Sequence, residues 1–287
     1  MVPSTAFGRP RAYQIPLVAR FRGTTARHGW VWRGRAGWGE FSPFDDYRPA
    51  DCIPWLLAAR EAADFGFPPP LRQQIPVNVT VPAVTPEMAA SLVESSGGCR
   101  TAKVKVGERG HTLAQERARL AAVREVLGPG GRIRVDANGA WDVDTAVRNL
   151  AALNRAAGGL EYAEQPCRTT AELAAVRRRS SVPVAADESI RRAADPFEVK
   201  RLEAADVVVL KVQPLGGVRA CLDLALRLEL PVVVSSAVET SVGLAMGVAL
   251  AAALPKLEFA CGLATGQLLV GDVVRDPLRV VDGCIEV

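Results

Sequence analysis

From Ile75 onward, short runs of β-branched residues alternate with helical segments rich in Ala, Leu and Arg. The runs, spaced about 22 to 30 residues apart, are VNVT at 77, AKVKV at 102, RIRVDA at 132, LEYAE at 160, VPVAADE at 182, DVVVLK at 206, PVVVSS at 231 and KLEFAC at 256. They are apolar without alternation, as strands buried on both faces are. Eight such units predict an α/β fold with a parallel (β/α)8-type barrel. A doubly wound open sheet is the alternative, but no glycine-rich phosphate turn follows the first run.

The segment before this pattern has a different character. In HGWVWRGRAGWGE, Trp30 and Trp32 alternate with other residues as they do in strands, and a helix-like run follows from about Pro49 to Phe65. Three consecutive prolines at 68–70 form a stiff linker. The sequence therefore predicts a small N-terminal α+β unit ahead of the barrel.

Composition excludes several classes of function. The formal net charge of +4 is spread over helical segments without a basic tail, which gives nucleic-acid binding little support. The six cysteines form no CxxC pair, which argues against a zinc site and a disulfide framework. The most apolar stretch, 242–254, is too short for a membrane span, and the N-terminus lacks the apolar core of a signal peptide. A cytoplasmic globular protein is expected.

Charged residues stand at or near the carboxyl ends of five consecutive runs, where barrel enzymes build their active sites. They are Lys103 and Lys105, Asp136, Glu164, Asp187 with Glu188, and Lys211. Carboxylates from three adjacent strands are hard oxygen ligands that suit Mg²⁺. Taken singly, each residue could be only a solvated strand end or a helix N-cap. Their shared position on consecutive strands favours a site.

The lysines point to proton chemistry, because only five of the 35 basic residues are lysines. Arginine cannot deprotonate in a protein, whereas a lysine can be tuned to exchange a proton near neutral pH. Lys103 and Lys105 face the same side of their strand, and Lys211 lies four strands away across the ring. A metal-bound carboxylate between them would have a nitrogen on each face of its α-carbon. This arrangement predicts abstraction of a proton α to a carboxylate.

Several longer motifs carry a family resemblance that spans residues 29 to 265. They are GWGEFSPF, TAKVKVG, VDANGAW, EYAEQP, AADES, VVLKVQPLGG and SSAVETSVGLA. With them the chain resembles the enolase superfamily, in its Lys-x-Lys branch, and most closely the o-succinylbenzoate synthase family. The resemblance implies a modified TIM barrel, (β/α)7β, formed by residues 75–261, with a small α+β capping domain formed by residues 1–74 and joined by the C-terminal tail 262–287.

The resemblance also implies a site. Mg²⁺, which Mn²⁺ can replace, would be bound by Asp136, Glu164 and Asp187. Lys105 would take the α-proton and then protonate the leaving hydroxyl, Lys211 would stabilise the enediolate by its charge, and Lys103 would hold the carboxylate and keep the pKa of Lys105 low. A small dicarboxylate substrate would be bound with the help of five further residues: Arg134, Asn138, Ser235, Ser236 and Gly262.

The implied reaction is dehydration of 2-succinyl-6-hydroxy-2,4-cyclohexadiene-1-carboxylate to 2-succinylbenzoate in menaquinone biosynthesis. N-succinylamino acid racemases, dipeptide epimerases and muconate-type cycloisomerases share the scaffold and stay open as alternatives. Pro214 stands where racemase-competent relatives often carry Arg, and residues 257–265 hold no Asp-x-Asp for a substrate amine. A non-catalytic barrel is disfavoured because all three lysines and all three carboxylates are kept. The oligomeric state is left open.

A lid is also expected over the barrel mouth. The segment Arg22 to Gly29 is rich in glycine and small polar residues and lies between two strand-like runs. Closure of this loop would exclude water and bring Arg22 or Arg27 to a substrate carboxylate. A plain surface hairpin is the alternative for the same segment.

Overall fold

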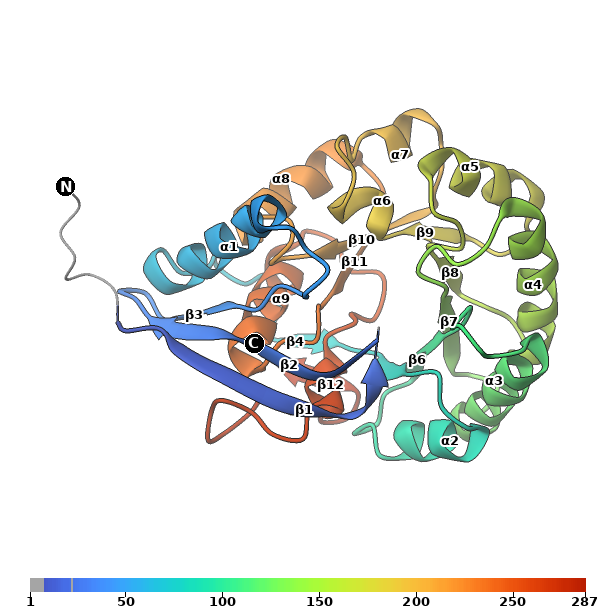
Figure 1. Cartoon of the computed structure of the whole chain (residues 1–287), viewed down its shortest axis with the longest axis horizontal. Helices are drawn as coiled ribbons and strands as arrows, with labels where there is room; N and C mark the ends of the chain where they lie inside the picture. The colour runs from blue at the N-terminus through green and yellow to red at the C-terminus, as the bar shows by residue number, and fades with distance from the viewer. Residues whose placement is uncertain (1–7, 22) are drawn as a thin grey trace.

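The computed structural model describes residues 8–21 and 23–287. A ring of helices surrounds a curled parallel sheet, and a small antiparallel sheet with helix α1 lies against one side of the ring (Figure 1). Fold class is therefore as the sequence predicts: a barrel of the α/β type accompanied by a smaller α+β unit.

The antiparallel sheet is formed by the N-terminal strands in the order β1-β2-β3 and is called here the N-terminal sheet. Its strands are β1 (Arg11–Phe21), β2 (Thr24–Arg33) and β3 (Trp38–Phe41), followed by the 3₁₀ helix η1 (Pro49–Cys52) and helix α1 (Ile53–Asp64). Trp32 packs with Ala59 and Ala63 of α1 in a buried cluster. Small residues on α1 let the helix lie close to β3, which fixes the helix against the sheet.

The expected lid loop is a strand. Residues 24–29 belong to β2 and pair with β1, with Arg27 opposite Ile15 and Gly29 opposite Tyr13. The lid prediction is wrong for these residues, and the alternative of a plain hairpin describes them. The ladder satisfies their backbone groups, which a mobile loop would leave to water. Arg22 lies outside the described residues.

Seven parallel strands form the barrel sheet, in the order β11-β10-β9-β8-β7-β6-β5. They are β5 (Val79–Val81), β6 (Thr101–Lys105), β7 (Arg132–Asp136), β8 (Tyr162–Glu164), β9 (Val184–Ala186), β10 (Val207–Lys211) and β11 (Val232–Ser235). All of their residues except Arg132 and Val232 are buried, as expected of strands covered on both faces. Each strand overlaps one of the predicted runs.

The eighth predicted run, KLEFAC at 256, does not form a strand. Its backbone is irregular until Cys261, which bridges Val77, and Gly262, which bridges Ser235. These two isolated bridges close the ring between β11 and the first strand. The carbonyl of Ala260 accepts a hydrogen bond from the Arg134 guanidinium at 2.7 Å. A side chain therefore satisfies a backbone acceptor that would pair with a neighbouring strand in a regular sheet.

Helices connect the barrel strands and cover the outside of the sheet (Figure 1). They are α2 (Pro86–Glu94), α3 (Leu113–Leu127), α4 (Val143–Ala156), α5 (Thr170–Arg179), α6 (Glu188–Arg191), α7 (Glu198–Arg201), α8 (Val218–Leu228) and α9 (Ser241–Ala253). Thr112 and Thr169 begin α3 and α5 with reciprocal capping boxes. Within residues 8–21 and 23–287, no helix is both long and apolar enough to cross a membrane.

The C-terminal tail contacts both parts of the molecule. After the 3₁₀ helix η2 (Ala264–Leu268), Leu269 bridges Leu17 of β1. The last strand, β12 (Cys284–Glu286), then pairs with β4 (Gln74–Pro76). The tail therefore adds to the N-terminal sheet at one point and to the chain entering the barrel at another. The division into residues 1–74 with 262–287 and residues 75–261 stays a prediction.

Close contact between β3 and α1 generates a stability prediction. A Cβ atom added at Gly39 would lie 2.1 Å from the carbonyl oxygen of Ala59, and this backbone oxygen cannot move without shifting the helix. We expect Gly39→Ala to lower the free energy of unfolding by about 1–3 kcal/mol. Gly37→Ala is the matched control, since its nearest atom is 3.7 Å away. Urea denaturation followed by circular dichroism compares the two variants, and equal midpoints would contradict the argument.

Candidate active site

The parallel register places the charged strand ends in line. Lys105 is paired with Asp136 across β6 and β7, and Asp136 is paired with Glu164 across β7 and β8. Asp187 directly follows β9, and Lys211 ends β10. Because the carboxyl ends of neighbouring parallel strands meet at the same edge, these side chains gather at one mouth of the barrel.

Each of the three carboxylates contacts a lysine. Lys105 Nζ lies 2.5 Å from Asp136 Oδ2, Lys103 Nζ lies 2.9 Å from Glu164 Oε2, and Lys211 Nζ lies 2.6 Å from Asp187 Oδ2. Every one of these six residues is buried, with no more than 7% of its surface exposed. The structure thus brings together all the residues predicted as metal ligands and catalytic lysines.

The two lysines of β6 differ in their electrostatics. Burial alone would lower the pKa of Lys103, but the charges of Glu164 and Asp136 outweigh it and raise that pKa. Burial also lowers the pKa of Lys105, the neighbouring charge of Lys103 adds to the effect, and here the lowering prevails. Lys103 is therefore held as a cation, whereas Lys105 is moved toward the neutral amine.

The carboxylates divide in a similar way. Burial raises the pKa of Glu164 to about 7, and the charge of Asp136 acts in the same direction. Burial would also raise the pKa of Asp136, yet the charges of Lys105 and Lys103 hold it well below its usual range. For Asp187 the same reversal comes from Arg191 and then Lys211. Negative charge is therefore crowded at this end of the sheet and needs cations close by.

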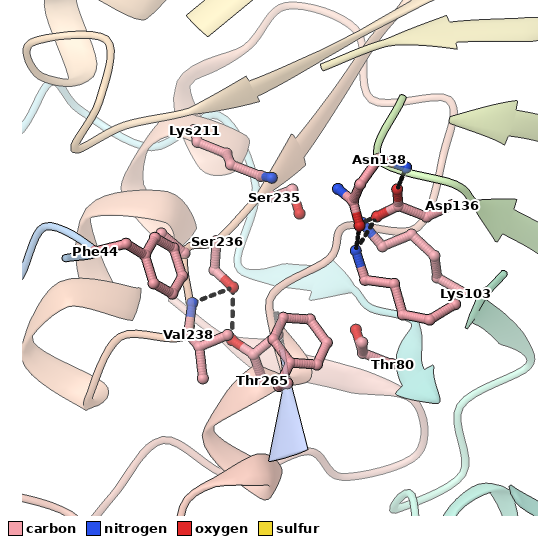
Figure 2. Close-up of a pocket in the computed structure, with 13 residues that line it drawn as sticks. Phe44, Thr80, Lys103, Asp136, Asn138, Lys211, Ser235, Ser236, Val238 and Thr265 are labelled. Atoms are coloured by element: carbon pink, nitrogen blue, oxygen red, sulfur yellow. Dashed lines mark hydrogen bonds and ion pairs between the residues drawn. The ribbon is translucent and has the colours of Figure 1, made fainter. Parts of the chain in front are cut away.

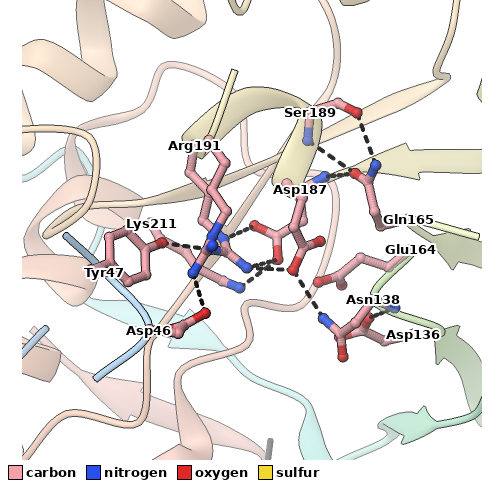
Figure 3. Close-up of polar contacts among 12 residues, drawn as sticks. Asp46, Tyr47, Asp136, Asn138, Glu164, Gln165, Asp187, Ser189, Arg191 and Lys211 are labelled. Atoms are coloured by element: carbon pink, nitrogen blue, oxygen red, sulfur yellow. Dashed lines mark hydrogen bonds and ion pairs between the residues drawn. The ribbon is translucent and has the colours of Figure 1, made fainter. Parts of the chain in front are cut away.

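The donor set has the chemistry of a Mg²⁺ site. Six carboxylate oxygens from three adjacent strand ends are hard ligands. A divalent cation would offset the burial and the repulsion by Asp136 that together raise the pKa of Glu164. Among the residues that the structure describes, no group of three or more His, Cys, Asp or Glu side chains stands in position for a metal as it is. The carboxylates are turned to their lysines and to Arg191, whose Nε lies 2.8 Å from Asp187 Oδ1 (Figure 3).

Two residues with positive φ shape the loops that follow β7 and β8. Asn138, at φ +47°, accepts a hydrogen bond from Lys105 Nζ at 2.5 Å and donates to Glu188 Oε1 at 3.1 Å. Gln165, at φ +41°, accepts from the backbone N–H groups of Asp187 and Ser189 (Figure 3). Sequence analysis did not single out Gln165, although it lies within the EYAEQP motif. Gln165 fixes the turn that presents Asp187.

A cavity opens beside the lysines. Its lining includes Lys103, Lys105, Asp136, Asn138, Lys211, Ser235 and Ser236, all expected from the sequence, together with Phe21, Phe44, Thr80, Ala237, Val238 and Thr265, which were not (Figure 2). Glu164 and Asp187 stand next to it, paired with Lys103 and Lys211. Phe21 and Phe44 come from the N-terminal part of the chain, whose apolar side chains therefore help to close a polar site.

Two expected substrate-binding residues lie away from the cavity wall. Arg134 is fully buried in the barrel interior, where its guanidinium contacts Glu161 at 2.5 Å, Asn78 at 3.1 Å and the Ala260 carbonyl. Gly262 supports the wall from behind, because a Cβ there would come within 2.5 Å of Ser235 Oγ.

Arg27, expected to reach a substrate carboxylate from the lid, also lies elsewhere. It is 2% exposed and donates to the carbonyl oxygens of Val238 and Ser42. This part of the lid prediction is wrong, because β2 points the side chain into the packed layer between the N-terminal sheet and the barrel.

Comparison with known proteins agrees with this geometry. Residues 86–287 match the family model "Enolase C-terminal domain-like", and residues 12–63 match "Enolase N-terminal domain-like". The chain is similar in fold to a solved dipeptide epimerase from Enterococcus faecalis complexed with Mg and the dipeptide L-Leu-L-Tyr, with a TM-score of 0.80, 20% identity and coverage of 99% of this chain and 97% of that one.

Two relatives are far more similar in sequence. An o-succinylbenzoate synthase of Thermobifida fusca is 65% identical over 277 residues, which cover 96% of this chain and 86% of the relative. An o-succinylbenzoate synthase of Mycolicibacterium smegmatis is 52% identical over 273 residues, which cover 95% and 84%. The buried lysines and carboxylates thus stand in a chain that belongs to the enolase superfamily and, within it, to the family of the o-succinylbenzoate synthases.

Proposed function

We propose that this protein dehydrates 2-succinyl-6-hydroxy-2,4-cyclohexadiene-1-carboxylate to 2-succinylbenzoate in menaquinone biosynthesis, with Mg²⁺ as cofactor. One observation carries the proposal: Lys105 and Lys211, from opposite sides of the ring, line a single cavity beside three carboxylates. The identity of 65% to a relative of that name supports the choice of reaction. The substrate is a small dicarboxylate.

Asp136, Glu164 and Asp187 would hold the Mg²⁺ ion. When bound there, the ion supplies positive charge that stabilises a substrate carboxylate as it gains electron density. The chain's own residues complete this field. Lys103 stays protonated beside Glu164 and adds a fixed positive charge on the β6 side, 3.6 Å from Asp136 Oδ2.

Lys105 is the proposed base. Its amine takes the proton from the α-carbon, and the electron pair of the broken C–H bond passes into the carboxylate to give an enediolate. The C–O bond of the ring hydroxyl then breaks as this electron pair forms the new C=C bond, and Lys105 returns its proton to the leaving oxygen, which departs as water. Burial lowers the pKa of Lys105, so the amine is available to take a proton.

Lys211 acts by charge in this proposal. Lys211 and Lys103 reach toward the cavity from different sides (Figure 2). A cation on the second face of the enediolate stabilises the negative charge without exchanging a proton. A cytoplasmic location and the domain division at residues 74 and 261 belong to the same proposal. The bridge between Leu269 and Leu17 supports the assignment of the C-terminal tail to the N-terminal unit.

Racemisation of N-succinylamino acids is the second candidate, since a lysine on each face also suits a mechanism with two bases. A direct assay separates the two. We expect the purified protein with Mg²⁺ to convert the cyclohexadiene substrate with kcat/KM at least about 10⁴ M⁻¹s⁻¹, the lower end for enzymes on their own substrates. Exchange of the α-proton of N-succinylamino acids should be far slower. Equal or greater efficiency with the amino acids would move the function to the racemase.

Removal of a carboxylate should remove the metal. Asp136→Asn, Glu164→Gln and Asp187→Asn keep side-chain size but lower the negative charge of the donor set, so each should weaken Mg²⁺ binding in calorimetry and abolish turnover. Chelation of the wild type should do the same reversibly. Asp223→Asn, at an exposed ion pair on α8, is the matched control and should bind Mg²⁺ normally. Full turnover in excess chelator would rule out the metal.

The lysine variants separate a base from a fixed charge. Lys105→Arg keeps a cation but cannot accept a proton at neutral pH, so kcat should fall by more than about 10⁴-fold, because one residue serves as both base and acid. Lys211→Arg should keep more activity than Lys211→Ala. The exposed Lys256→Arg is the control. If Lys211→Arg lost as much activity as Lys105→Arg while both variants bound Mg²⁺, Lys211 would also transfer a proton.

A further inference from the structure

The loop that follows β11 has a strained backbone. Its residues Ser236, Ala237 and Val238 line the cavity (Figure 2). Val238 has φ +60°, the left-handed region that a β-branched residue rarely enters. Such a conformation persists only where neighbouring groups hold it. The contacts of residues 236–239 should therefore show what keeps this part of the cavity wall in shape.

One holding contact comes from β2. Arg27 Nε donates to the Val238 carbonyl oxygen at 3.2 Å, and another nitrogen of the same guanidinium donates to the Ser42 carbonyl oxygen. The guanidinium carbon also lies 4.0 Å from the centre of the Phe44 ring. Val238 and Phe44 both line the cavity. A single buried arginine of the N-terminal sheet thus fixes two cavity residues that are far apart in the sequence.

A second contact comes from β3. The Glu40 carboxylate is fully buried and accepts hydrogen bonds from Tyr13 at 2.8 Å and Ser42 Oγ at 2.7 Å within the N-terminal region. It also accepts from the side chain of Thr240 and from the Gly243 N–H at 2.9 Å, at the start of α9. Thr240 makes no side-chain cap for its own helix. The Glu40 side chain on β3 therefore caps the N-terminus of α9 in place of a residue of the helix's own segment.

Glu239 lies between these two attachments in the sequence. It closes the loop locally, since its Oε2 accepts a hydrogen bond from the Ala237 N–H at 2.6 Å. Space around Glu40 is tight, because a Cβ at Gly243 would lie 2.9 Å from the Glu40 carboxyl carbon. Arg27 holds the loop by the Val238 carbonyl, and Glu40 holds the first turn of α9 directly after it. The start of the loop directly follows β11 and is held by the hydrogen bond between Ser236 Oγ and Thr265 Oγ1 at 2.6 Å. Its second half is held by the N-terminal sheet through these two contacts.

We propose that Arg27 and Glu40 are positioning residues that hold residues 236–239 in the strained shape needed to bind substrate, so that docking of the N-terminal sheet completes the cavity wall. Neither residue lines the cavity, and each acts through the loop. The inference rests on the proposed function for its substrate, and it adds residues whose effect should fall on substrate binding more than on the chemical step.

The test uses Arg27→Lys, which keeps the charge but loses the planar pair of donors and the stacking on Phe44. We expect KM for the cyclohexadiene substrate to rise about tenfold, with kcat changed by less than about threefold. Hydrogen exchange followed by mass spectrometry should show peptides spanning residues 235–243 exchanging about tenfold faster. Peptides from α4 should be unchanged.

Arg124→Lys is the matched control. Arg124 also donates to backbone carbonyls, those of Ala157, Gly128 and Gly131, but in loops at the amino ends of the strands. It should lower thermal stability without raising KM. If Arg27→Lys does not fold, Glu40→Gln serves instead, since it keeps the size of the side chain and should speed exchange of the Thr240 and Gly243 amides while raising KM.

The outcomes separate the two proposals. Faster exchange in residues 235–243 with unchanged KM would overturn the positioning role, as would unchanged exchange. A rise in KM equal to that of Arg124→Lys would also overturn it. If the wild type lacked synthase activity, the proposed function would fail, and KM would be measured with whichever substrate the protein accepts, with exchange still reporting whether the two residues hold the loop.

Discussion

Neutralisation of buried charge is the constraint on which the rest of the structure depends. Three carboxylates and three lysines lie at the carboxyl ends of β6 to β10 with almost no contact with water. Removing such groups from water costs several kcal/mol per ion unless each finds an opposite charge. The parallel register meets this demand by aligning Lys105, Asp136 and Glu164 on neighbouring strands. The barrel thus holds paired positive and negative side chains that could also pair with a bound cation and with an anionic substrate.

Much of the fold follows from the sequence because its signal is local. Seven apolar runs became seven parallel strands, since each run carries its own β-propensity and its own following helix. The eighth run did not form the predicted strand, and the contact that differs there is not local. The Ala260 carbonyl accepts a hydrogen bond from Arg134, which lies 126 residues earlier in the sequence. The glycines and small polar residues of Arg22 to Gly29 predict a loop, but cross-strand pairing with β1 decides the conformation of residues 24–29.

The candidate site divides in the same way. Its charged residues could be predicted because polar side chains at the ends of apolar strands are conspicuous, and their catalytic roles stay predictions. The cavity positions of Phe21, Phe44 and Thr265 could not be predicted, because their residue types do not stand out in the sequence and they reach the cavity through packing of distant segments. The depth of Arg134 within the barrel could not be predicted from the sequence either. Alternation along a strand shows that a side chain points inward, but not at which level of the barrel it finds its partners.

Contacts between the two ends of the chain also affect how the protein can fold during synthesis. Glu40 finds its partner at Gly243 only after a further 203 residues, and Leu17 meets Leu269 later still. Pairings at such separation form slowly, because the intervening chain must first be brought together. The N-terminal sheet therefore leaves the ribosome with the face that will cover the barrel still bare, and it stays unpartnered until nearly the whole chain has been made. Until then this face is a surface for chaperones to shield.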